Sequence, residues 1–139
     1  MFACCLIVAG LVAGCARTPP EQALRDTLAR LQQGIEARDT DALEQSLAAD
    51  FVGPDGLDKA GARRLAALML LRHQAVGLVF GPLDLQVNDR HATVRFTAAV
   101  TGGSGRMLPD SAQVYEVETG WRLEGDDWRM TSAAWKPEL

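Results

Sequence analysis

The hydrophobic period of this chain changes once, near residue 73, and that change constrains the fold most strongly. Before it, apolar residues recur at helical spacing, as Leu24, Leu28 and Leu31 do within residues 21–38. After it, apolar and polar residues alternate, which is typical of half-buried strands. Helices followed by antiparallel strands predict an α+β fold, with the N-terminal helices packed in a curved antiparallel sheet.

Three helices are expected before the change of period. They lie at 21–38, at about 40–47 and from Asp58 to near His73. An aspartate ahead of each later helix offers a side-chain oxygen as N-cap, and the turn-forming run 51–56 separates these two helices. Gly34 lies within the first helix, where glycine costs about 1 kcal/mol relative to alanine. We therefore expect another element to approach the first helix closely at Gly34.

Four strands are expected after the change of period. Alternating apolar positions place them at 83–87, 92–100, 111–123 and 128–135. Residues 88–90 and 125–127 form turns, and the glycine-rich stretch 101–105 forms a flexible loop. These elements predict a meander of long antiparallel strands.

One face of this sheet is apolar and is expected to lie inward. Alternation assigns to it seven candidate pocket-lining residues: Phe96, Tyr115, Thr119, Trp121, Trp128, Met130 and Ser132. The charged residues of the same strands alternate onto the outward face, where cross-strand pairs in solvent contribute little each. An enzyme that transfers protons in an apolar cavity needs an ionisable group inside it. The pattern therefore predicts no catalytic residue, unless a β-bulge turns Glu116 or Arg95 inward.

Two stretches of the sequence resemble the nuclear transport factor 2-like superfamily. They are Ala37-Arg38-Asp39-Thr40-Asp41-Ala42-Leu43 leading to Asp50-Phe51, and Trp121-Arg122-Leu123-Glu124-Gly125-Asp126-Asp127-Trp128-Arg129. The resemblance covers nearly all of residues 21–135 and implies a cone, formed by a curved sheet wrapped around helices. Members of that superfamily include ketosteroid isomerase, scytalone dehydratase, polyketide cyclases and many proteins with no catalysis. The resemblance therefore does not decide the function.

The enzyme branches of that superfamily match this chain weakly. Ketosteroid isomerase uses an Asp base with Tyr and protonated Asp donors, and Tyr115 offers a donor here without an inward Asp beside it. Scytalone dehydratase relies on histidines and aspartates, whereas this chain has two histidines, His73 near a helix end and His91 at a strand start. The two histidines are far apart in the sequence, and no two carboxylates have the spacing of a metal-binding pair. We therefore predict no metal and no other cofactor.

The N-terminal residues are typical of a targeting signal rather than of a folded element. The apolar run before Cys15 ends on small residues and is too short to span a bilayer as a helix. It resembles the bacterial lipoprotein signal, which implies removal of residues 1–14, lipidation of Cys15 and a lipidated tether over 15–20, ahead of a domain at 21–139. The alternative is an ordinary apolar segment packed in a core. The resemblance implies a lipid-anchored protein of the cell envelope, in the outer membrane facing the periplasm.

The balance of charge limits the partners. The chain carries 18 acidic and 14 basic side chains, and this mildly acidic balance argues against nucleic acid as a partner. Within it, Lys59, Arg63 and Arg64 form a small basic face on the third helix. This face is solvated, or it meets anionic headgroups if the protein is tethered to a membrane.

Three hypotheses follow for function. The first is a non-catalytic, membrane-anchored lipoprotein that binds a small apolar ligand in its cone or a protein partner on its sheet. The second is an isomerase, dehydratase or cyclase that acts on a hydrophobic substrate, with Tyr115 as a donor. The third is an accessory envelope subunit that forms a homodimer through the outer face of the sheet. The apolar inner face favours the first hypothesis.

Overall fold

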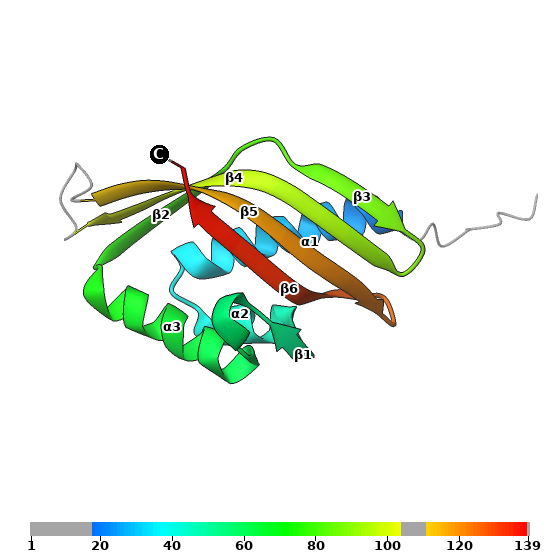
Figure 1. The fold of residues 1–139 in the computed structure, drawn as a ribbon, viewed down its shortest axis with the longest axis horizontal. Helices are drawn as coiled ribbons and strands as arrows, with labels where there is room; N and C mark the ends of the chain where they lie inside the picture. The colour runs from blue at the N-terminus through cyan, green and yellow to red at the C-terminus, as the bar shows by residue number, and fades with distance from the viewer. Residues whose placement is uncertain (1–17, 104–110, 139) are drawn as a thin grey trace, which may run out of the picture.

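The computed structural model describes residues 18–103 and 111–138, and they form an α+β fold as predicted (Figure 1). The elements follow in this order: α1 (Pro20–Glu36), α2 (Thr40–Ser46), β1 (Leu47–Val52), the 3₁₀ turn η1 (Pro54–Gly56), α3 (Lys59–Arg72), β2 (Ala75–Phe80), β3 (Asp84–Asn88), β4 (His91–Gly103), β5 (Ser111–Glu124) and β6 (Asp127–Pro137). The predicted cleavage and lipidation sites, Gly14 and Cys15, lie outside the described residues.

The strands form one curved sheet that covers the helices on one side. Its order is β1-β6-β5-β4-β2, and β3 also pairs with β4. β1 runs parallel to β6, and the other pairs are antiparallel. Figure 1 shows α1 crossing behind the long strands, whereas α3 lies along the lower side of the domain, where it packs against α2 and β1. Within residues 18–103 and 111–138, no helix is both long enough and apolar enough to cross a bilayer.

Two of the strands were not predicted from the sequence. Leu47 begins β1 rather than ending a helix, and β1 continues through Phe51 into the run expected to form a turn. β2 was missed altogether because its apolar run does not alternate. It pairs with residues 98–103 of β4, so the first part of the predicted flexible loop is a strand. Both strands depend on partners that are distant in sequence, which local periodicity does not report.

A β-bulge on β6 changes which residues face inward. Trp121 pairs with Met130, whereas Gly120 pairs with Ser132, so Thr131 is the extra residue. A Cβ atom built on Gly120 would lie 2.5 Å from the Ser132 hydroxyl, which places both on the outer face. The prediction that Ser132 faces inward is therefore wrong, because a bulge reverses the alternation that follows it.

The hydrophobic core lies where α1 crosses the sheet. The leucine face predicted for the first helix is confirmed, since Leu24, Leu28 and Leu31 are buried there. The close approach predicted at Gly34 is also present, because a Cβ atom at that position would lie 3.1 Å from the Cβ of Ala42 on α2. The other buried apolar members of this core are Leu47, Phe51, Ala92, Val94, Trp121, Trp128 and Met130.

Candidate functional site

Four of the seven predicted pocket residues fill the core. Trp121 and Trp128 are each 1% exposed, and Thr119 and Met130 are also buried. The Trp121 indole donates to the Thr119 hydroxyl at 2.8 Å, and the Trp128 indole donates to the Pro20 carbonyl at 3.0 Å. Throughout the described part of the chain, every buried side-chain nitrogen and oxygen has a hydrogen-bond partner. These four side chains therefore stabilise the fold and leave no polar group free for a ligand.

Two further predicted residues are on the inner face but are only half-buried. Phe96 is half-buried, and its ring packs on Phe80 with 4.7 Å between the ring centroids. Tyr115 is also half-buried, and it pairs across the sheet with Ala98 and with Pro137 near the end of β6. The structure therefore brings Phe96 and Tyr115 to the same half of the sheet, away from the buried tryptophans.

Trp135 is the aromatic residue that the sequence reasoning missed. It pairs with Val117 and so faces inward, a position that alternation without the bulge assigned to Ala134. In the described strands, the pairing of β1 with β6 reaches only as far as Ser132, so Trp135 lies on a free edge and is 40% exposed. No local sequence signal marks the bulge at Thr131, and this explains why Trp135 was placed on the wrong face.

Trp135 borders a hollow between the sheet and the start of α3, which we call the mouth hollow. Its volume is about 530 Å³, and it is lined by Pro54, Asp55, Gly56, Leu57, Asp58, Gly61, Arg64, Leu65 and Trp135. Asp58 is occupied as the N-cap of α3, because its carboxylate accepts from the Gly61 amide at 2.7 Å. The hollow thus offers apolar surface from Leu57, Leu65 and Trp135, and a polar rim.

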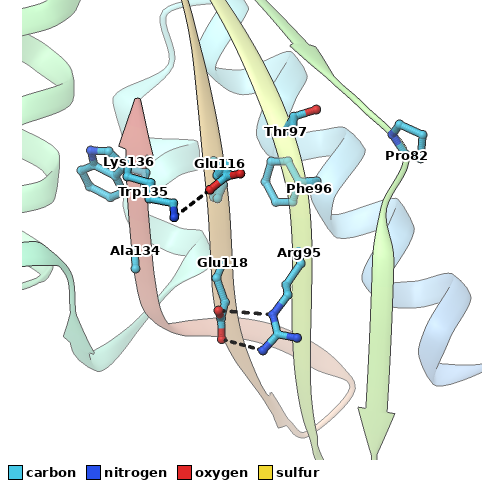
Figure 2. Close-up of a pocket in the computed structure, with 10 residues that line it drawn as sticks. Pro82, Arg95, Phe96, Thr97, Glu116, Glu118, Ala134, Trp135 and Lys136 are labelled. Atoms are coloured by element: carbon cyan, nitrogen blue, oxygen red, sulfur yellow. Dashed lines mark hydrogen bonds and ion pairs between the residues drawn. The ribbon is translucent and has the colours of Figure 1, made fainter. Parts of the chain in front are cut away.

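A second hollow, the outer groove, lies across β4, β5 and β6 on the opposite face (Figure 2). Its volume is about 660 Å³, and its lining includes Arg95, Glu116, Glu118 and Lys136. Trp135 lines this groove as well as the mouth hollow. The Arg95 guanidinium lies 3.3 Å from the Glu118 carboxylate, and the Lys136 ammonium lies 3.0 Å from the Glu116 carboxylate. The predicted outward position of Arg95, Glu116 and Glu118 is confirmed. Because the charged residues of the groove pair with one another in solvent, the groove presents little unbalanced charge to a ligand.

The two histidines lie on different elements of the described part of the chain. His73 ends α3 with its ring against Gly102, and His91 is exposed at the start of β4. In the described ranges, no three His, Cys, Asp or Glu side chains group closely enough to hold a metal ion.

The clearest electrostatic perturbation belongs to an ion pair on the surface. Arg122 donates to both carboxylate oxygens of Asp50, at 2.8 and 3.1 Å, and it also bonds Glu124. The hydrogen bonds from Arg122 lower the pKa of Asp50, and both carboxylates raise the pKa of Arg122. None of these three residues lines either hollow, so we interpret the cluster as structural.

No protein-family model and no curated protein sequence matches this chain. Solved structures do match it, at low sequence identity. Bd1075 of Bdellovibrio bacteriovorus superimposes with a TM-score of 0.75 and 11% identity over 84% of this chain, which spans 41% of the Bd1075 chain. A nuclear transport factor 2-like superfamily protein from Salmonella enterica gives a TM-score of 0.74 and 13% identity, over 86% of this chain and 92% of its own. The chain has the nuclear transport factor 2-like fold.

Within the nuclear transport factor 2-like fold, proton-transfer chemistry needs an ionisable group on the inner face of the cone. The register of the described strands places Arg95, Glu116 and Glu118 outside, and no Asp, Glu, His, Lys or Arg of β4 or β5 shares the face of Trp121. Tyr115 shares this face, and its hydroxyl belongs to a half-buried side chain, whereas Thr119 is buried. The two strands therefore supply no charged side chain to the inner face, whereas the imidazole of His73, which follows α3, lies against Gly102 on that face.

Proposed function

We propose that this chain is a non-catalytic binding protein of the cell envelope, anchored through a lipid on Cys15. It holds a small apolar ligand in the mouth hollow, with Trp135 as the surface on which the ligand stacks. The observation that carries the proposal is the exposure of Trp135, which is 40%, against 1% for Trp121 and Trp128. An inward-facing tryptophan left open at the edge of a hollow is available to a ligand.

The surroundings of Trp135 agree with this function. A volume of about 530 Å³ lies within the range of small-molecule sites. Leu57, Leu65 and Trp135 supply apolar surface to it, and Asp55, Asp58 and Arg64 supply charged groups. Leu65 and Met69, one turn apart on α3, are both exposed, and Leu65 lines the hollow. A ligand that covered Leu65 and Trp135 would remove apolar surface from water at about 25 cal/mol per Å².

The binding test uses N-phenyl-1-naphthylamine, a neutral aromatic fluorophore that brightens in apolar sites. We expect the full-length chain to bind it, and Trp135→Ala to weaken binding about tenfold or more. Val79→Ala is the matched control, because Val79 is an exposed apolar residue (65%) that lines neither hollow. Because Trp135 also lines the outer groove, Leu65→Ala, at a residue that lines only the mouth hollow, should weaken binding as well. Unchanged binding by either Trp135→Ala or Leu65→Ala would reject the mouth hollow as the site.

The anchor is tested separately. Native mass spectrometry on protein extracted from its host's membranes should find a chain that begins at Cys15 and carries acyl mass, together with a bound small molecule. A Cys15→Ser variant should lose the acyl mass. An unacylated chain that keeps residues 1–14 would overturn the anchoring but leave the binding test standing.

A further inference from the structure

We propose that the solvent-facing side of α3 docks onto an anionic lipid surface. The docking side is formed by Arg64, Leu68, Leu71 and Arg72, which are spaced at i, i+4, i+7 and i+8 and so lie on one side of the helix. This inference goes beyond ligand binding in the mouth hollow, and it holds whether or not Cys15 is lipidated.

The charge of α3 opposes that of the whole chain. Lys59, Arg63, Arg64 and Arg72 give this 14-residue helix four basic side chains and no acidic one, although the chain carries a net charge of −4. Arg63 is used within the fold, because it lies 2.8 Å from Asp41 and also pairs with Glu44. Among the described residues, neither Arg64 nor Arg72 has an ion pair or a side-chain hydrogen bond. Two cations are therefore left to meet an external anion.

Apolar side chains lie between these two cations. Leu71 is 84% exposed and Leu68 is 45% exposed, and no residue of α3 is fully buried. The leucines of α3 are spread around the helix. Some of them therefore stay in water, whichever side of α3 packs on the domain. A lone exposed leucine is ordinary, but two on the side that carries two unpaired arginines form one amphipathic surface.

A lipid surface fits this combination better than an acidic protein does. Leucine side chains enter the boundary between headgroups and acyl chains, while arginines extend to the phosphates on their own apolar stems. An acidic protein would satisfy Arg64 and Arg72 but would leave Leu71 without an apolar partner. Each basic residue near an anionic leaflet contributes about 1 kcal/mol, so the two arginines add a modest, salt-sensitive attraction.

The test measures sedimentation of the full-length chain with vesicles. One set contains equal phosphatidylglycerol and phosphatidylcholine, and the other contains phosphatidylcholine alone. The test variant is Leu71→Glu/Arg72→Glu. The control is Val79→Glu/Arg30→Glu, which makes the same change in charge and hydropathy at exposed positions on β2 and α1. Because residues 1–17 are identical in all three proteins, a difference between variants reports on α3.

We expect the test variant to bind the anionic vesicles about tenfold more weakly than the control, with little difference between the two on neutral vesicles. Hydrogen exchange should also slow across residues 64–72 when the wild-type chain meets anionic vesicles. Equal binding of the test and control variants to anionic vesicles would overturn the proposal. Unchanged hydrogen exchange in α3 of the vesicle-bound chain would overturn it too. Binding of the chain to an acidic protein in the absence of lipid would likewise overturn it. Binding of N-phenyl-1-naphthylamine by the test variant distinguishes this failure from failure of the mouth hollow, since Leu71 and Arg72 do not line it.

Discussion

The two ends of this domain use similar residues in opposite ways. At the closed end, defined by Trp121 and Trp128 with the leucines of α1, both tryptophans are 1% exposed and both indoles are hydrogen-bonded. At the open end, defined by Trp135 and α3, the tryptophan is 40% exposed and α3 buries no residue. The comparison teaches that an apolar inner face does not by itself form a pocket. The mouth hollow lies at the end whose tryptophan is exposed, between that tryptophan and the start of α3.

The helices that cover the two ends are held by different forces. α1 packs three buried leucines against the sheet, so its attachment is mainly hydrophobic. α3 is tied at its ends by polar contacts. Arg63 pairs with α2 near the start of α3, and Arg38 donates to the carbonyls of Leu70, His73 and Gln74 at its end. We therefore expect the closed end to set global stability and the open end to set local motion.

The strongest test of this division is Trp121→Ala. Removing a fully buried tryptophan leaves a cavity and takes away the indole that donates to the Thr119 hydroxyl, and large-to-small changes of this kind cost about 3–5 kcal/mol. We expect denaturant unfolding to show a loss of this size. A loss below about 1 kcal/mol would show that the closed end is not a rigid core.

The open-end counterpart is Trp135→Ala. Because its ring is 40% exposed at a free strand edge, we expect a loss of about 1 kcal/mol in the free energy of unfolding, well below that of Trp121→Ala. The same denaturant titration measures both variants. Equal losses would remove the distinction between the two ends, whatever the result of ligand binding.

The sequence predicted the closed end better than the open end, for a physical reason. Local periodicity predicts the leucine face of α1 and the burial of Trp121 and Trp128. Such periodicity can be read from one short stretch of sequence. The open end depends on pairing between distant strands. β2 was missed because its run around Gly77 does not alternate. A Cβ atom at Gly77 would lie 2.4 Å from the Thr101 hydroxyl, so a larger residue would force the Thr101 side chain to move.

The candidate site was the part least accessible to sequence reasoning. Alternation along β6 predicted Ser132 as a pocket residue, but the bulge at Thr131 sends it outward and turns Trp135 inward. Phe96 and Tyr115 were assigned to the correct face, although neither lines the mouth hollow. Their role as ligand contacts stays a prediction.

A smaller and more local effect is expected from Arg38→Ala. Arg38 adopts a positive φ of 63°, and its guanidinium lies 2.8 Å from the His73 carbonyl and 3.3 Å from that of Gln74. Loss of these exposed hydrogen bonds should free the end of α3 at a local cost of about 1 kcal/mol. Hydrogen exchange in residues 66–72 should then quicken roughly fivefold while exchange in α1 stays unchanged. Faster exchange in both helices would mean that α3 does not move independently of the core.

The smallest effect concerns surface charge beside the closed end, where Asp50 on β1 meets Arg122 on β5. Because Arg122 lowers the pKa of Asp50 in the folded state, the pair stabilises the fold above the ordinary aspartate pKa of 3.8, and this contribution is lost as the pH falls through the lower folded value. Asp50→Asn should therefore lower the melting temperature slightly at neutral pH, and the difference from wild type should shrink in acid. High salt should reduce it as well, since the Asp50 side chain is exposed and that of Arg122 is partly exposed. Asp126→Asn, in the turn before β6, controls for the change in net charge. If the two variants melt alike at neutral pH, the pair contributes nothing, and the stability of the closed end comes from apolar burial without help from its surface charges.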